Sequence, residues 1–204
     1  MSSSESNPKS NSKPEKSFSD LPQSDDHLRE HQTSSEDVYS GKFLHLKKDM
    51  VRLPDGNTTF REYLIHPGAV AIMPILSDGR ILLERQFRYP VDATMIEIPA
   101  GKLDLGEDPL LCAQRELLEE TGYSAKSWEF LGRIHPVISY STEIIDIYLA
   151  KDLTLGERAL DEGEFLDVFA ATLDEMHEWI ASGAITDVKT IISVYHLARR
   201  LKQI

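Results

Sequence analysis

Apolar residues along this chain gather in short runs separated by turn-forming residues, a pattern typical of β-strands. The runs are rich in Val, Ile, Leu, Phe and Tyr, and Gly, Pro, Asn and Asp bound them. The predicted strands are residues 43–47, 58–65, 69–76, 80–87, 95–99, 128–134, 143–150 and 165–170. Turn residues between the first two runs, and again between the next two, predict a pair of hairpins.

Three other stretches space their apolar residues by three and four positions, which indicates helices. The first follows Asp108 and Pro109, a good N-cap and first helical residue, and Gly122 is suited to end it. The expected packing face of this helix consists of Leu110, Leu111, Leu117 and Leu118. The second helix is expected after Thr172, and the third within residues 186–202.

Strands interrupted by one helix and closed by two others predict an α/β protein, an α/β/α sandwich on a mixed sheet with a small N-terminal β element. The length of 204 residues suits one main domain, which we assign to residues 67–204. Residues 39–66 are expected to form the N-terminal hairpin element. Residues 1–38 are rich in Ser, Asn, Pro and charged side chains, so we expect a disordered tail of unknown role.

Composition excludes several classes of partner. The net charge of −12 opposes binding to nucleic acids or anionic membranes, because both would repel the chain. No apolar run reaches the ~20 residues of a membrane-spanning helix, and the polar N-terminus does not predict a signal peptide. The single cysteine, Cys112, cannot form an intrachain disulfide and is expected to be a small buried side chain. These features favour a cytoplasmic protein.

Three carboxylates, those of Glu116, Glu119 and Glu120, fall on one face of the first predicted helix. Like charges this close repel and raise one another's pKa unless a cation lies among them. Hard oxygen ligands of this kind suit Mg²⁺ or Mn²⁺. The helix therefore predicts a divalent-metal site.

The residues around these glutamates follow the spacing G-x5-E-x7-R-E-U-x-E-E-x-G-U, where U is apolar or aromatic. The pattern begins at Gly101, includes Glu107 and Arg115, and ends at Tyr123, a less usual final residue. This stretch resembles the Nudix box, the signature of the Nudix hydrolases. A looser resemblance covers most of the chain from about residue 40. It implies metal-dependent hydrolysis of a phosphoanhydride on an α/β/α sandwich.

The resemblance also implies the ligands of the metal. Glu116 and Glu120 would hold Mg²⁺, with Mn²⁺ as a substitute, and Glu119 and the Ala100 carbonyl would join them. Arg115 cannot coordinate a cation, but its guanidinium can orient a carboxylate, so we place it with Glu119 among the catalytic residues. Gly101 is expected to permit a tight turn, and Glu107 to secure the following loop.

The base that activates water is expected outside the helix, because a metal-bound carboxylate is a poor proton acceptor. Residues 160–165 form an acidic loop before a predicted strand. ADP-ribose pyrophosphatases of the Nudix family use glutamates of a similarly placed loop. By this resemblance Glu162 is assigned as the base and Glu164 as a further metal ligand, with the two roles open to exchange.

Segments flanking the box look like the ADP-ribose pyrophosphatase branch; they are residues 61–62, 66–70, 85–90 and 97–102. Pro136 lies near a proline of that branch, but residues 137–139 depart from it where a Pro-Gly pair is common, which leaves the terminal-ribose pocket undefined. The implied substrate-binding residues are Arg61, Arg88, Glu97 and Glu143. An arginine fork suits the diphosphate, and its plane can stack on adenine. Tyr89 is either a base-stacking residue or a core residue.

The sequence therefore predicts a Mg²⁺-dependent hydrolase that cleaves ADP-ribose to AMP and ribose 5-phosphate. Two alternatives stay open: hydrolysis of other nucleoside diphosphate sugars, and a Nudix module that binds ADP-ribose without cleaving it and regulates a partner. Enzymes of this branch commonly exchange the N-terminal element between two subunits. A homodimer is therefore implied, in which Arg61 reaches the substrate bound mainly by the other subunit.

Overall fold

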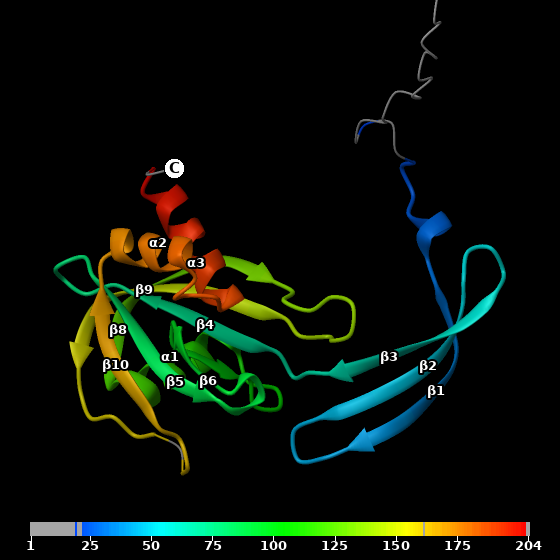
Figure 1. Ribbon diagram of the computed structural model, residues 1–204, viewed down its shortest axis with the longest axis horizontal. Helices are drawn as coiled ribbons and strands as arrows, with labels where there is room; N and C mark the ends of the chain where they lie inside the picture. Colours follow the sequence, from blue (N-terminus) through cyan, green and yellow to red (C-terminus); the bar gives the residue numbers. More distant parts are fainter. Residues whose placement is uncertain (1–18, 20–21, 161, 203–204) are drawn as a thin grey trace, which may run out of the picture.

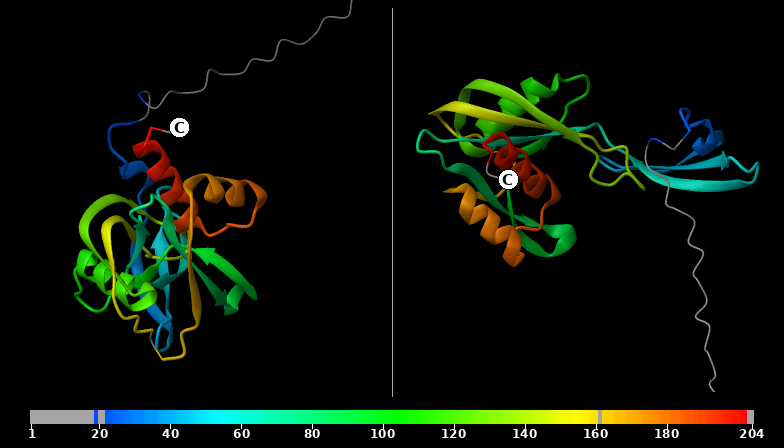
Figure 2. Two further views of the ribbon diagram at one scale, coloured as in Figure 1. Left: turned by 90° about the vertical axis from the view of Figure 1, so that its left-hand side faces the viewer. Right: turned by 90° about the horizontal axis from the view of Figure 1, so that it is seen from above.

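The computed structural model describes residues 19, 22–160 and 162–202, and Figure 1 shows them as two unequal parts. The smaller part is an antiparallel sheet in the order β1-β2-β3. It contains β1 (His31–Ser40), β2 (His45–Arg52) and β3 (Thr58–Ile65), preceded by the short 3-10 helix η2 (Asp26–Leu28). This sheet stands to one side of the main domain and joins it through the end of β3, as the view from above in Figure 2 also shows.

The predicted hairpin of this element is confirmed, since β2 and β3 pair along their whole length. The predicted boundary of the tail at residue 38 is wrong, because it lies inside β1. Every residue of β1 is exposed, and backbone pairing with β2 defines the strand. A count of apolar residues misses such a strand because the strand buries no side chain. The first part of the expected tail, residues 1–18 and 20–21, lies outside the described residues.

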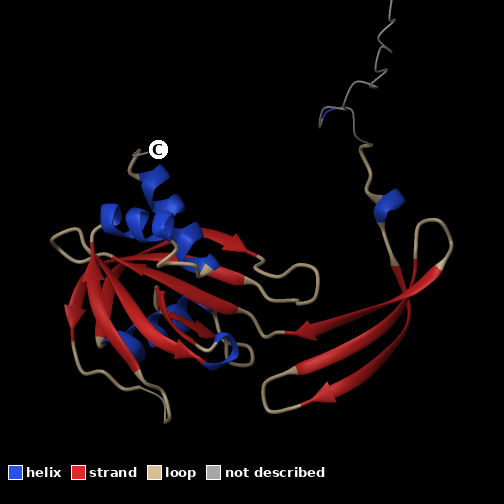
Figure 3. Cartoon of the chain, in the orientation of Figure 1, coloured by secondary structure: helices blue, strands red, loops and turns tan. Residues whose placement is uncertain are grey.

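The main domain combines two sheets with three α-helices, and Figure 3 shows how the strands and helices lie together. Its elements are β4 (Ala69–Pro74), β5 (Ile81–Arg88), η3 (Tyr89–Val91), β6 (Ala93–Glu97), β7 (Ala100–Lys102), α1 (Pro109–Thr121), β8 (Tyr123–Ile134), β9 (Ile145–Leu155), β10 (Leu166–Ala171), α2 (Leu173–Ser182) and α3 (Val188–Arg200). A mixed sheet has the order β7-β4-β9-β8, with β4 and β9 parallel, and an antiparallel sheet has the order β10-β5-β6. The predicted fold class, an α/β sandwich on a mixed sheet, is confirmed.

The predicted hairpin between residues 69–76 and 80–87 is wrong. β4 and β5 enter different sheets and share only the isolated bridge between Ile75 and Ile81. The long edges of β4 are occupied by β7 and β9, while β5 pairs with β6 and β10. A turn signal predicts a reversal of the chain, but it does not say which sheet edge the next strand will join.

Strand β4 organises the core because all six of its residues are buried. Its alternate side chains point to opposite faces of the sheet. Ala69, Ala71 and Met73 pack into a cluster with residues of α2 and α3, whereas Val70 and Ile72 pack against α1. A strand covered on both faces reads as a continuous apolar run. The mixed sheet is therefore the middle layer of the sandwich.

Helix α1 begins and ends as predicted. The Asp108 side chain accepts hydrogen bonds from the backbone N–H groups of Leu110 and Leu111, and Gly122 takes the left-handed conformation with φ 77°. The second helix also begins as predicted, since Thr172 and Glu175 form a capping box at the start of α2. Within the described ranges, every helix is too short or too polar to span a lipid bilayer.

The predicted packing face of α1 is wrong in part. Leu117 is fully buried, but Leu111 is 59% exposed and Leu118 is 40% exposed. The buried face instead carries Cys112, Ala113, Leu117, Glu120 and Thr121. Cys112 is buried as expected, and burial raises the pKa of its thiol to about 12. The helix thus packs with the face that includes one of the three predicted metal ligands.

Candidate active site

Two glutamates of α1 lie against the backbone of β7. Glu120 is 4% exposed, and its Oε2 accepts a hydrogen bond of 3.0 Å from the backbone N–H of Ala100. The Glu116 carboxylate lies so close to Gly101 that a Cβ atom at position 101 would overlap it. The reason expected for Gly101, a tight turn, is wrong, because this residue belongs to strand β7 and its φ is not positive. The glycine is needed because a carboxylate approaches the backbone there.

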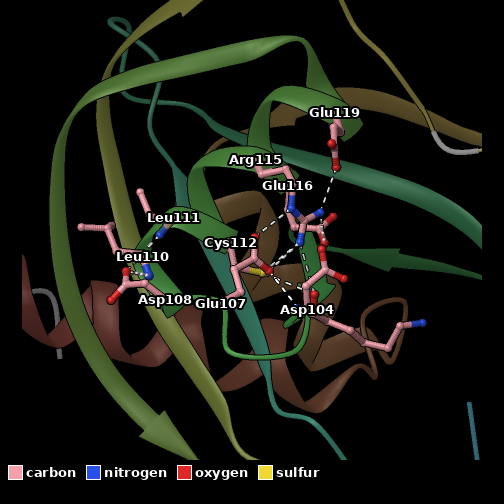
Figure 4. Close-up of polar contacts among 10 residues, drawn as sticks. Asp104, Glu107, Asp108, Leu110, Leu111, Cys112, Arg115, Glu116 and Glu119 are labelled. Carbon is pink, nitrogen blue, oxygen red and sulfur yellow. Dashed lines mark hydrogen bonds and ion pairs between the residues drawn. The ribbon is translucent and has the colours of Figure 1, made fainter.

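Arg115 holds three glutamates together, Glu107, Glu116 and Glu119, as Figure 4 shows. Its Nε and Nη2 atoms donate to the two carboxylate oxygens of Glu107 at 3.0 and 2.9 Å. Its Nη1 atom donates to Glu116 at 2.8 Å and to Glu119 at 3.0 Å. Glu107 also accepts from the backbone N–H of Asp104 at 2.9 Å, and its pKa falls to about 2, mainly through the bond to Arg115. These contacts tie the loop before α1 to the helix.

The two glutamates of α1 that lie against β7 resist being charged. Burial raises the pKa of Glu120 to about 10, and the charges of Glu84, Glu116 and Glu164 add to this effect. Burial also raises the pKa of Glu116, although Arg115 opposes the change. A divalent cation among these oxygens would remove the penalty.

The residues present fit a hard cation by their chemistry, because the cluster offers carboxylate oxygens in a buried position and Gly101 leaves room for one of them. In the described part of the chain, no three acidic, His or Cys side chains already surround one point as a formed metal site. Arg115 instead draws Glu116 and Glu119 towards itself.

Sequence reasoning missed Glu84. This residue of β5 is 2% exposed, and burial raises the pKa of its carboxyl group to about 8. It follows the buried residues Ile81, Leu82 and Leu83. A lone acidic residue in the buried half of a strand is a signal for function, but it is easily taken for the start of the polar half.

A second wall of the site carries two cations on one carboxylate. Arg88 donates to both oxygens of Glu97, at 2.7 and 2.9 Å, and Lys189 forms a salt bridge with the same carboxylate. Lys189 also lies 3.1 Å from Asp187, the N-cap of α3. Burial alone would raise the pKa of Glu97, but Arg88 and Lys189 together lower it. Lys189 was not predicted, because a lysine in the first turn of a helix carries no distinctive signal.

Both walls face one cleft of about 410 Å³. Its lining residues are His66, Ala69, Val70, Arg88, Ala100, Gly101, Lys102, Glu116, Glu120, Pro136, Glu143, Ile145, Glu164, Asp187, Val188 and Lys189. Six of the predicted site residues therefore meet here; they are Arg88, Ala100, Glu116, Glu120, Glu143 and Glu164. Glu143 lies 3.6 Å from the Nε2 atom of His66, and Glu164 accepts a hydrogen bond of 3.2 Å from Gln86.

Several predicted residues lie outside this cleft. Glu162 is exposed, Glu119 is held by Arg115, and Arg61 on β3 pairs with Glu30 at 3.0 Å in the separate N-terminal sheet. Glu97 lies behind its two cations. Tyr89 is 86% exposed, so a core role for it is wrong.

Comparison with known proteins assigns the family. Residues 65–191 match the NUDIX domain, and residues 30–64 match the nucleoside diphosphate sugar hydrolase N-terminal domain. The chain belongs to the Nudix family. The predicted family membership is thus confirmed, and the division at residues 64 and 65 coincides with the end of β3.

Named relatives of this Nudix protein cover most of its length. A methanol dehydrogenase activator of Bacillus methanolicus is 44% identical over 165 residues, 80% of this chain and 89% of the relative. An ADP-ribose pyrophosphatase of Bacillus subtilis (strain 168) is 39% identical over 172 residues, 83% of this chain and 93% of the relative. A crystal structure of an ADP compounds hydrolase has a TM-score of 0.78 at 23% identity, covering 86% of this chain and 96% of the other, and shows the same fold.

The close approach of Glu116 to Gly101 is testable by a double-mutant cycle. Gly101→Ala should cost about 1–3 kcal/mol of stability, because the new methyl group overlaps the carboxylate. The same change should cost much less in a Glu116→Ala background, where the carboxylate is absent. Urea unfolding of the four proteins measures both costs. Gly156→Ala, where an added Cβ meets only ordinary contacts, is the control. Equal costs in the two backgrounds would show that Glu116 is not the neighbour that matters.

Proposed function

We propose that this Nudix protein hydrolyses the pyrophosphate bond of ADP-ribose to AMP and ribose 5-phosphate in a reaction that depends on Mg²⁺. The observation that carries the proposal is the division of one cleft into a wall of carboxylates and a wall of cations. Carboxylates suit a divalent ion, and Arg and Lys suit phosphate oxygens. The ADP-ribose pyrophosphatase of Bacillus subtilis supports this choice of substrate.

The carboxylate wall would hold the metal. Glu116, Glu120 and Glu164 line the cleft and are the proposed ligands, with Glu119 and the Ala100 carbonyl as further ones. Mn²⁺ is the expected substitute. When bound, Mg²⁺ offsets the negative charge of the phosphate oxygens and makes water a better nucleophile. Arg115 keeps Glu116 and Glu119 oriented through its two hydrogen bonds.

The cation wall would hold the substrate. Arg88 and Lys189 are fixed on Glu97, so their remaining N–H groups are oriented before the diphosphate arrives. Such preorganisation lowers the entropic cost of binding. Glu143, beside His66 and Pro136 in the same cleft, is the proposed contact for the terminal ribose.

Metal binding through Glu120 is the first property to test. Glu120→Gln should lower kcat for ADP-ribose by orders of magnitude and weaken Mg²⁺ binding, while the helix still folds because Gln has a similar helix propensity. Chromatography of the products would follow the release of AMP. Glu178→Gln, on the exposed face of α2, is a matched control and should behave as wild type. Near-normal turnover by a folded Glu120→Gln protein would rule out this site.

The base is assigned to the loop before β10, with Glu162 and Glu164 as candidates. Glu164 lies in the cleft and accepts a hydrogen bond from Gln86, whereas Glu162 is exposed. The variant that removes the base should lose roughly 10²-fold or more in kcat with unchanged metal affinity. The variant that removes a ligand should bind Mg²⁺ more weakly. Kinetics and metal titration of Glu162→Gln and Glu164→Gln separate the roles, and wild-type behaviour of both would contradict the assignment.

A second candidate is hydrolysis of other nucleoside diphosphate sugars, which the match of residues 30–64 favours. Parallel assays of ADP-ribose and other nucleoside diphosphate sugars would rank the substrates by kcat/KM. The alternative of binding without cleavage would appear as saturable ADP-ribose binding with no AMP released in Mg²⁺. We place the protein in the cytoplasm, where such nucleotides are available.

We also propose that the protein is a homodimer whose two subunits exchange their N-terminal sheets. Large apolar residues of this sheet and of the loop between β1 and β2 are exposed in one copy of the chain; they are Val38, Tyr39, Phe43, Leu44, Met50 and Phe60. A sheet of three strands with apolar groups on its surface needs a partner to cover them. In the dimer Arg61 would reach the substrate bound mainly by the other subunit.

Truncation tests the dimer. Deleting residues 1–66 should abolish both dimerisation and activity, whereas deleting residues 1–29, which spares β1 and Glu30, should affect neither. Light scattering gives the mass in solution, and the ADP-ribose assay gives the activity. A fully active monomer at working concentration would refute the exchange.

A further inference from the structure

Glu84 is a buried carboxylate that the roles proposed above leave unexplained. It is 2% exposed, and its Oε1 atom has no hydrogen-bond partner among the described residues. Buried polar atoms without a partner cost stability and are rare in folded proteins. Such an atom next to a cluster of acidic side chains indicates that something else binds there.

Among the described residues Glu84 takes part in no ion pair, although the charge of Arg158 is near enough to oppose the rise in its pKa. In the antiparallel pair of β5 and β6, Glu84 stands directly opposite Glu97, and like charges in this arrangement repel. Glu97 is neutralised because Arg88 and Lys189 both bind its oxygens. Neither cation forms a described ion pair with Glu84. The carboxyl group of Glu84 instead lies near those of Glu120 and Glu164.

Strand β5 gives these contacts a simple geometry. Glu84, Gln86 and Arg88 are alternate residues, so their side chains lie on the same face of the strand. Each meets a different glutamate: Glu84 meets Glu120, Gln86 meets Glu164, and Arg88 meets Glu97. Gln86 and Arg88 are donors that satisfy their glutamates. Glu84 is instead an acidic acceptor, so it adds a negative charge on the face where Gln86 and Arg88 supply donors.

We propose that Glu84 is a further ligand of the divalent cation, which it binds through Oε1 beside Glu120 and Glu164. The inference rests on the cation site of the proposed function. It explains why an unpaired carboxylate is kept in a strand whose preceding residues are all buried and apolar. The cation would offset the repulsion among Glu84, Glu120 and Glu164 that the fold leaves uncompensated.

The test is Mn²⁺ binding to the full chain, measured from the electron paramagnetic resonance signal of free Mn²⁺ without substrate. Glu84→Gln keeps the size of the side chain but removes the charge, and should raise the Kd for Mn²⁺ on the order of 10- to 100-fold. Glu84→Asp keeps the charge but withdraws it by one methylene group, and should raise the Kd less. Glu178→Gln on α2 should bind as wild type does.

A second readout separates a metal ligand from a residue needed only for folding. Without metal, Glu84→Gln should unfold at a higher temperature than wild type, because a buried uncompensated carboxylate has been removed. With saturating Mn²⁺ that advantage should disappear. A residue needed only for packing would instead lower the unfolding temperature in both conditions, which would overturn the proposal.

An unchanged Kd for Mn²⁺ in a folded Glu84→Gln protein would also overturn it. If that variant does not fold, an unchanged Kd for Mn²⁺ in the Glu84→Asp protein would overturn the proposal instead. ADP-ribose turnover is scored separately. Metal binding that depends on Glu84 in a protein that does not release AMP would refute the proposed substrate and leave this inference standing. Release of AMP by a protein whose Kd for Mn²⁺ does not change on substitution of Glu84 would support the proposed substrate and refute this inference.

Discussion

Repulsion among buried carboxylates is the constraint around which the site is built. Glu84, Glu116, Glu120 and Glu164 share one polar volume between α1, β5 and the loop before β10, and burial together with their mutual charge raises the pKa of Glu120 to about 10. Such a cluster is stable only when it is protonated or neutralised by a cation. Several nearby cations bind other carboxylates: Arg88 and Lys189 bind Glu97, and Arg115 divides its donors among Glu107, Glu116 and Glu119. The fold thus leaves a place for a mobile divalent ion.

The sandwich keeps this cluster in position through an edge strand. β7 pairs only with β4, so the backbone of its other edge is free to meet side chains of α1. The N–H of Ala100 donates to Glu120, and Gly101 admits the carboxylate of Glu116. β4 itself is buried on both faces, which fixes β7 relative to α1 through the apolar contacts of Val70 and Ile72. Packing of the apolar core therefore fixes the positions of the polar side chains in the site.

Local signals in the sequence were sufficient for the box helix and its carboxylates. Asp108 and Gly122 define the ends of α1 by rules that depend only on nearby backbone groups. The hairpin expected between β4 and β5 was wrong because strand pairing depends on distant partners. Glu84 and Lys189 were missed for a related reason. Each acquires its significance from residues far along the chain, Glu120 and Glu97, which no local pattern brings together.

The two arginines proposed to bind substrate, Arg61 and Arg88, differ in how firmly their partner carboxylates hold them. In one copy of the chain Arg61 lies on β3, where it pairs with Glu30 in an ion pair whose side chains are 47% and 34% exposed. An exposed pair of this kind contributes only about 0–1 kcal/mol. Arg61 can therefore leave Glu30 for a phosphate at little cost. Arg88 is held more firmly, because its partner Glu97 is almost fully buried and would lose one of its two counter-ions. One arginine is built to stay in the cleft, and the other is free to be brought to a diphosphate.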